Sequence, residues 1–124
     1  MKLLVVDDSS VIRKVIKTAA DMLQMEVAEA QDGIEALEII SQIYKEINLI
    51  LLDWNMPEMS GYEALVEIKK NDLYKHIPVM MVTTEGQQSN IVAAVQAGAS
   101  NYLVKPFTVE ELESKILECL GMSN

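Results

Sequence analysis

The chain has 124 residues, which is typical of one domain, and its 50% apolar and 23% charged residues are ordinary for a protein with a buried core. Ten basic residues against 19 acidic ones give a net charge of −9, and Arg13 is the only arginine. This balance argues against a nucleic-acid surface, which needs clustered Lys and Arg, and it excludes an arginine cluster for phosphate. We therefore expect no nucleic-acid partner.

The sequence also predicts where the protein works. The single cysteine, Cys119, cannot form an internal disulfide, and it lies in an amphipathic pattern that favours a buried structural thiol. The longest apolar run is five residues, Ile91 to Val95, which is too short to cross a membrane. We expect a cytoplasmic protein without membrane insertion.

Short apolar runs alternate with stretches of helical period along the whole chain. Continuous apolar runs are typical of strands that are covered on both faces of a parallel sheet. They predict strands at residues 3–6, 27–30, 49–52, 79–82 and 102–104, with the second at a sheet edge. Apolar residues that recur every three to four positions predict helices over residues 11–23, 34–44, 62–68, 91–95 and 112–120.

This alternation predicts the α/β class, with five βα units that form a doubly wound, parallel five-stranded sheet. The commonest strand order for such a sheet is 2-1-3-4-5. Ser60 with Glu63 and Thr108 with Glu111 have the spacing of capping boxes, which satisfy two free amides at a helix start. Gly121 stands where a glycine C-cap is expected.

A polar residue follows most of the predicted strands. Asp7 and Asp8 follow the first, Asp53 the third, Thr83 the fourth and Lys105 the fifth. Since the carboxyl ends of parallel strands share one sheet edge, we expect these side chains to converge, with Asp53 in the middle. Helix caps and turns also favour Asp and Thr, but the presence of such residues at four of the five strand ends favours a functional site.

The three carboxylates need an offsetting charge, because two unit charges about 4 Å apart repel by about 4 kcal/mol at an effective dielectric of about 20. A few oxygen ligands fit Mg²⁺, whereas zinc is disfavoured because the single histidine, His76, falls in a loop away from this edge. A metal-bound carboxylate opposite a lysine and a hydroxyl predicts phosphoryl transfer to Asp53, with Lys105 and Thr83 contacting the phosphoryl oxygens.

Competing chemistries lack their motifs. No Gly-rich loop follows the first strand, so nucleotide phosphate sites of that kind are excluded. Asn55 stands two residues after Asp53, where a phosphatase with an aspartyl intermediate uses a second carboxylate. A Mg²⁺-dependent phosphatase and a non-phosphorylated interaction module of the same fold remain alternatives.

The whole sequence resembles the receiver domain of two-component response regulators, and most closely the single-domain, CheY-like chemotaxis regulators. The resemblance rests on Val6-Asp7-Asp8-Ser9-Ser10, Leu52-Asp53-Trp54-Asn55-Met56-Pro57 with Gly61, Val82-Thr83, and Ala97-Gly98-Ala99 before Lys105-Pro106-Phe107. It implies a flavodoxin-like fold in which residues 1–124 form one receiver domain without an output domain.

The resemblance also implies roles for the residues that match the family's motifs. Asp53 is the phosphoacceptor and binds Mg²⁺ together with Asp8 and the backbone carbonyl of Asn55, while Asp7 holds the metal through water. Lys105 contacts the phosphoryl group, and its bond to Pro106 is expected to be cis. Thr83 moves toward the phosphoryl group and Tyr102 turns inward in step.

The family further implies a monomeric signalling switch rather than an enzyme, although the protein assists its own phosphorylation and dephosphorylation. The phosphodonor is a histidine kinase, and the output is contact with a protein such as the flagellar motor switch or a phosphatase. A phosphorelay intermediate is the alternative within the family. The expected output surface is the fourth helix, fifth strand and fifth helix.

Three further positions near the site can be compared with the family pattern. Asn55 and Glu85, two residues beyond Asp53 and Thr83, match the chemotaxis regulators, in which these positions tune hydrolysis of the acyl phosphate. Thr84 departs from the pattern, because the residue after the switch threonine is usually small. We expect Thr84 to slow the approach of a phosphodonor.

Overall fold

The computed structural model describes residues 1–122 and has strands and helices in strict alternation. The strands are β1 (Lys2–Val6), β2 (Glu26–Ala30), β3 (Ile47–Leu52), β4 (Val79–Thr83) and β5 (Asn101–Val104). The helices are α1 (Ser10–Met22), α2 (Gly33–Ile43), α3 (Gly61–Lys70), α4 (Gln88–Gln96) and α5 (Val109–Cys119). All ten predicted elements are present, which confirms the α/β class.

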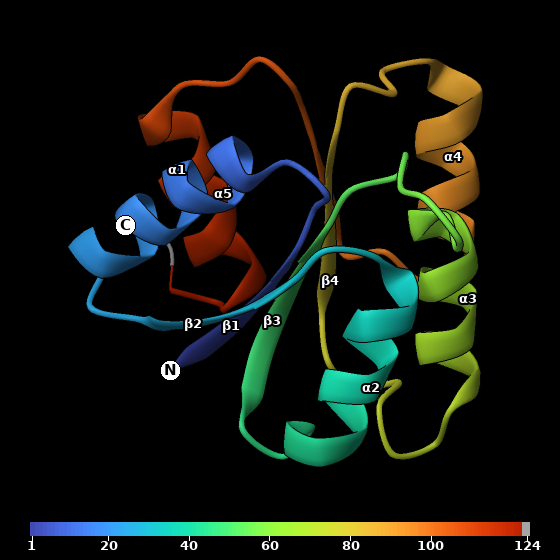
Figure 1. Cartoon of the computed structure of the whole chain (residues 1–124). Helices are drawn as coiled ribbons and strands as arrows, with labels where there is room; N and C mark the ends of the chain where they lie inside the picture. The colour runs from blue at the N-terminus through green and yellow to red at the C-terminus, as the bar shows by residue number, and fades with distance from the viewer. Residues whose placement is uncertain (123–124) are drawn as a thin grey trace.

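The five strands form one parallel sheet in the order β2-β1-β3-β4-β5, as predicted. Figure 1 shows α1 and α5 on one face of this sheet and α2, α3 and α4 on the other. Alternate residues of β1 therefore enter different cores: Leu4 and Val6 pack beneath α2 and α3, whereas Leu3 and Val5 pack beneath α1 and α5. Burial on both faces explains why β1 is a continuous apolar run.

The helix ends follow the capping chemistry of the sequence. Both predicted capping boxes form at the starts of α3 and α5. Gly121 has φ +69° just after α5, in the left-handed region that favours glycine. Cys119 is half-buried at the end of α5, and burial raises the pKa of its thiol, which fits the predicted structural role.

The helix boundaries differ from the predicted ones by one to three residues, most at the starts of α4 and α5. The apolar pattern placed the fourth helix at residues 91–95, but α4 begins three residues earlier, at Gln88. Its first turn is polar and exposed at residues 88 and 89, so hydrophobic periodicity could not detect it. The α3 helix likewise extends beyond the predicted residues 62–68 and ends at Lys70.

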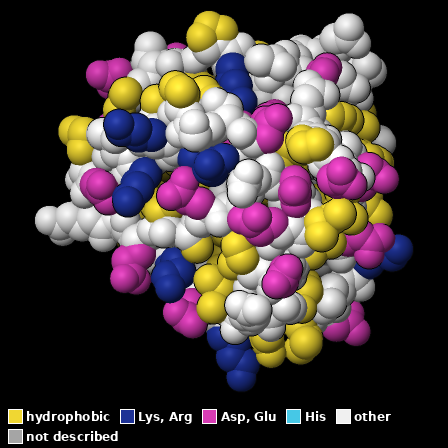
Figure 2. Space-filling model, in the orientation of Figure 1, with side chains coloured by type: hydrophobic (Ala, Val, Ile, Leu, Met, Phe, Trp, Pro, Cys, Tyr) yellow, Lys and Arg dark blue, Asp and Glu magenta, His cyan; other side chains and the backbone are white. Residues whose placement is uncertain are grey.

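The acidic residues are spread over the surface rather than gathered in one field. In Figure 2, Asp and Glu side chains lie among hydrophobic ones on the side of α2 and α3, while several Lys and Arg side chains gather on the side of α1. Arg13 of α1 pairs with Glu29 of β2, with Nε 3.0 Å from the carboxylate oxygen. Among residues 1–122, none of the helices has the length and apolar character needed to cross a bilayer.

Gly61 allows the loop after β3 to turn sharply into α3. Its N–H donates a 2.8 Å hydrogen bond to the carbonyl oxygen of Trp54. A Cβ atom at this position would overlap the backbone carbonyl of Asp53. The loop therefore depends on glycine at this position because of close backbone approach.

We predict that Gly61→Ala lowers the free energy of unfolding by about 1–3 kcal/mol, since the added methyl group must displace rigid backbone. Urea unfolding monitored by circular dichroism measures this loss. Gly86→Ala is the matched control, because a Cβ atom there would meet only the Val104 side chain. Equal stability of the two variants would contradict the proposed role of the Gly61 contact.

Candidate functional site

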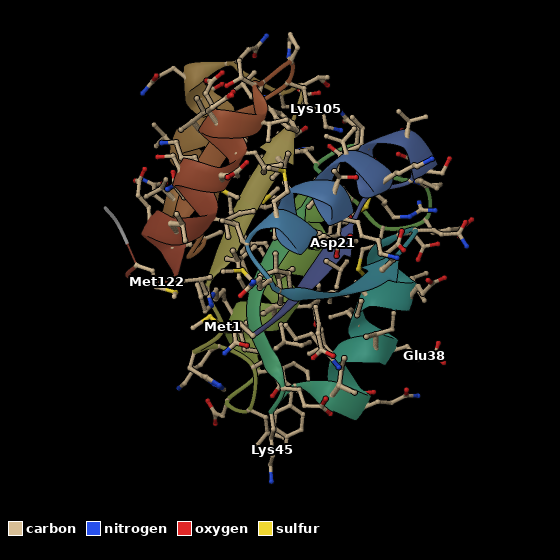
Figure 3. The ribbon with its side chains drawn as sticks, turned by 90° about the vertical axis from the view of Figure 1, so that its left-hand side faces the viewer. Met1, Asp21, Glu38, Lys45, Lys105 and Met122 are labelled. Carbon is tan, nitrogen blue, oxygen red and sulfur yellow. The ribbon has the colours of Figure 1, made fainter. Side chains whose placement is uncertain are left out.

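The predicted polar residues lie together at the carboxyl-end edge of the sheet. Backbone hydrogen bonds set their positions: the Asp53 N–H donates to the Val6 carbonyl at 2.9 Å, and the Lys105 N–H donates to the Thr83 carbonyl at 2.9 Å. Figure 3 shows Lys105 at the edge of the sheet opposite Met1, which marks the amino end of β1. The expected convergence is therefore present in the structure.

Three carboxylates form the centre of this site. Asp7, Asp8 and Asp53 each present an oxygen within 4.8 Å of the others. Asp7 and Asp53 are only 2% and 6% exposed, whereas Asp8 is exposed to solvent. The cluster therefore has a buried interior and one open side from which a ligand can enter.

One lysine offsets part of this negative charge. Lys105 Nζ lies 2.8 Å from Asp7 Oδ2 and 3.5 Å from Asp53 Oδ2, so its closer partner is Asp7. The peptide bond from Lys105 to Pro106 is cis, as the family resemblance implies. Because Lys105 is engaged mainly by Asp7, Asp53 is left as the carboxylate with the weaker ion pair.

The environment of Asp53 disfavours its ionised form. Burial raises the pKa of the Asp53 carboxyl, and the nearby charge of Asp7 raises it further. A hydrogen bond from Thr83 and the charge of Lys105 act in the opposite direction but do not cancel the effect. The three carboxylates carry more negative charge than one lysine can neutralise, and all their donor atoms are oxygens. The cluster therefore fits Mg²⁺ in both ligand type and charge.

An apolar cavity of about 420 Å³ opens beside the site. Its walls come from α1, the residue after β4 and the segment after β5, and they comprise Ile12, Val15, Thr84, Lys105, Pro106 and Phe107. Thr84 is exposed, and the structure thus places it on the wall of a cavity that it shares with Lys105.

Glu85 joins several parts of the site. Its carboxylate accepts a 2.8 Å hydrogen bond from the Asn55 amide, and its N–H donates a 3.3 Å bond to Thr83 Oγ1. Its carbonyl accepts a short hydrogen bond from the Tyr102 hydroxyl. Burial raises the pKa of Tyr102, followed by the charges of Glu85 and Asp53. Tyr102 is therefore turned inward, toward the loop after β4.

Sequence reasoning missed three contributors to this site. Arg13 Nη1 donates a 2.7 Å hydrogen bond to the Asp7 carbonyl, and Ser9 N–H donates a 2.9 Å bond to Asp7 Oδ1. Asn90 donates a 3.2 Å bond to the Glu85 carboxylate from α4. Arg13 is the only arginine and lies in the first turn of α1, five residues after Asp8, whereas no pattern identifies Asn90.

Comparison with known proteins assigns this arrangement to a family. The model of the response regulator receiver domain matches residues 3–117. The chemotaxis protein CheY homolog of Campylobacter jejuni is 42% identical over 122 residues, which cover 98% of this chain and 93% of that protein. Chemotaxis protein CheY1 of Helicobacter pylori is 42% identical over 125 residues and is covered completely, as is this chain.

The solved structures agree with the sequence matches. The structure of chemotaxis protein CheY4 from Vibrio cholerae superposes with a TM-score of 0.89 at 34% identity, over 96% of this chain and 98% of that one. At this level of identity, the similarity extends beyond the fold to the family.

We predict that Asp53→Asn raises the free energy of unfolding at pH 7 in buffer with a chelator of divalent cations. The folded-state pKa lies above the ordinary 3.8, so folding favours the protonated carboxyl. Ionisation of Asp53 therefore costs stability that grows as the pH rises from the unfolded-state pKa through the folded-state pKa. The neutral amide avoids this cost, and the two proteins should converge in stability below the unfolded-state pKa.

Urea unfolding at a series of pH values measures this difference. Asp21→Asn is the control, because Asp21 is exposed on α1 and its replacement should leave stability nearly unchanged. Added Mg²⁺ should narrow the gap between wild type and Asp53→Asn, since a bound cation stabilises the ionised site. A wild-type protein as stable as Asp53→Asn at pH 7 without metal would refute the prediction.

Proposed function

The chain belongs to the response regulator receiver domain family, and from this membership we propose that Asp53 accepts a phosphoryl group in a chemotaxis-type signalling switch. Receiver domains of this type are signalling switches and not classical enzymes. The observation that carries the proposal is the position of Asp53, buried beside Lys105 and Thr83 at an acidic sheet edge that is open on the side of Asp8.

The proposed donor is the phosphorylated histidine of a kinase. An oxygen of Asp53 attacks phosphorus, a P–O bond forms as the P–N bond breaks, and the leaving imidazole takes up a proton. Lys105 stabilises the charge that spreads over the phosphoryl oxygens, and the Thr83 hydroxyl donates to one of them. By supplying these groups, the protein assists its own phosphorylation. The same groups assist dephosphorylation, in which water attacks phosphorus, the P–O bond to Asp53 breaks and inorganic phosphate leaves.

Receiver domains bind Mg²⁺ at an acidic pocket, and the carboxylate cluster fits this ion. We assign the ligands to Asp8, Asp53 and the backbone carbonyl of Asn55, with Asp7 acting through water. When bound, the ion neutralises charge on the phosphoryl oxygens. The residues of the chain fix the ligand positions, because β1 and β3 are neighbours in the sheet.

Thr83 and Tyr102 are the proposed switch. A phosphoryl group on Asp53 favours the arrangement in which Thr83 faces it and Tyr102 is inward. The hydrogen bond from the Tyr102 hydroxyl to the Glu85 carbonyl supports this proposal, because it joins Tyr102 to the loop that follows Thr83. The output surface is then formed by α4, β5 and α5.

The relatives support a partner class. Because they are named chemotaxis proteins, we propose a histidine kinase as donor and a flagellar motor component or a phosphatase as the protein contacted in the cytoplasm. Residues 1–124 act in this proposal as one monomeric receiver domain. An aspartyl-phosphate phosphatase is not favoured, since Asn55 replaces the second carboxylate, and a phosphorelay intermediate is not favoured by these relatives.

Trp54 provides the test of this function, because it is the only tryptophan and follows Asp53 directly. We expect its fluorescence to respond to Mg²⁺ and then to acetyl phosphate or beryllofluoride. Asp53→Asn should abolish the response to the phosphodonor, together with the mass increase of one phosphoryl group. No response of the wild type to any of the three additions would refute the proposed function.

Thr84 provides a second prediction. Thr84→Ala should speed phosphorylation by acetyl phosphate about threefold, because a smaller side chain widens the approach beside Lys105, and this factor corresponds to about 0.7 kcal/mol of barrier. Stopped-flow fluorescence of Trp54 measures the rate. Thr18→Ala is the matched control, since Thr18 is exposed on α1 and is absent from the cavity wall. Equal rates for the wild type and Thr84→Ala would contradict the prediction.

A further inference from the structure

The helix α4 is held weakly compared with the other helices. Ala94 is its only buried residue, and its N-cap, Gln87, makes no side-chain capping hydrogen bond. Among residues 1–122, the only side-chain hydrogen bond of α4 is the one from Asn90 Nδ2 to Glu85 Oε2, at 3.2 Å. A helix with so few buried contacts is an element that small free energies can shift.

The same carboxylate reaches the phosphoryl site. Glu85 Oε1 accepts the 2.8 Å hydrogen bond from Asn55 Nδ2, so one side chain bridges the loop after β3 and the first turn of α4. The two residues that donate to Glu85, Asn55 and Asn90, are 35 positions apart in the sequence. Hydrogen bonds to a charged carboxylate are stronger than those between neutral groups.

We propose that Asn90 is a positioning residue for the phosphoryl site, which acts through the Glu85 carboxylate on Asn55. The inference rests on the proposed function, in which the carbonyl of Asn55 is a metal ligand. Asn90 fixes the rotamer of Glu85, and Glu85 holds Asn55 and its loop in place before a ligand arrives. Binding of the ligand then requires less ordering of that loop.

The coupling is reciprocal by thermodynamic necessity. If Asn90 strengthens ligand binding at the site, a ligand that orders Asn55 also stabilises the Glu85–Asn90 bond and the start of α4. The side chain of Glu85 thus adds a polar connection between the site and α4, beside the hydrogen bond that the Tyr102 hydroxyl donates to the Glu85 carbonyl.

Mg²⁺ alone is the probe, and Trp54 fluorescence gives its dissociation constant. We expect Asn90→Ala to raise this constant about threefold to tenfold, the effect of losing one partly exposed hydrogen bond to a charged group. Ser89→Ala, in the same exposed turn, should leave it unchanged. In a Glu85→Ala background, Asn90→Ala should have no further effect, because the connection is already broken.

Asn90→Asp separates positioning from a structural role. An added carboxylate in the first turn stabilises a helix, so a structural role predicts a higher urea midpoint and unchanged metal binding. Our proposal predicts weaker Mg²⁺ binding, because Asp cannot donate to Glu85 and repels it. Ser89→Asp adds the same charge one residue earlier and controls for the general attraction of Mg²⁺ to negative charge.

Four results would overturn the inference. The first is wild-type Mg²⁺ affinity in Asn90→Ala, and the second is that Asn90→Ala weakens Mg²⁺ binding as much in the Glu85→Ala background as in the wild type. The third is equal Mg²⁺ affinity in Asn90→Asp and Ser89→Asp. The fourth is that Ser89→Ala weakens Mg²⁺ binding as much as Asn90→Ala does. A wild-type protein that responds to Mg²⁺ while Asn90→Ala matches it refutes only this inference. A wild type that shows no response to Mg²⁺, acetyl phosphate or beryllofluoride refutes the proposed function and the inference together.

Discussion

The site depends on two buried carboxylates that the fold brings close together. Asp7 and Asp53 extend neighbouring parallel strands, and both are almost completely buried. Their repulsion and desolvation cost free energy, and Lys105 offsets only part of it because it lies nearer Asp7 than Asp53. The negative charge that Lys105 leaves unneutralised at Asp53 allows the site to attract a cation. The local loss of folding stability is therefore part of the chemistry of the site.

The rest of the fold keeps this unfavourable arrangement in place. Two backbone hydrogen bonds, from Asp53 to Val6 and from Lys105 to Thr83, extend the sheet by one residue. The residues of the site are therefore held by the same hydrogen bonding as the strands. Apolar cores on both faces stabilise the central strands, and close approach at Gly61 holds the loop after Asp53. Precision at the site is therefore supplied by hydrophobic packing that lies outside it.

The sequence predicts the fold and the site membership well because both follow from local patterns. Apolar runs mark the strands, and the residue after each run falls at the functional edge by topology alone. Side-chain pairing is different. Nothing in the sequence tells that Lys105 prefers Asp7, or that Glu85 bonds to both Asn55 and Asn90, because these choices depend on rotamers of segments far apart in the chain. The polar first turn of α4 escaped detection for a related reason, since it has no apolar face.

The contrast between the central sheet and α4 is what a switch requires. A central strand such as β4, buried along its entire length, resists change, whereas α4 has one buried residue and an uncapped start. A change at Asp53 can therefore have its largest structural effect where the opposing packing energy is smallest, at α4 and the adjoining Tyr102. The same reasoning divides the acidic charge of the protein. Asp7, Asp8 and Asp53 lie together at the sheet edge and form the proposed site, whereas Glu85 links that site to α4 and Glu63 and Glu111 cap helices.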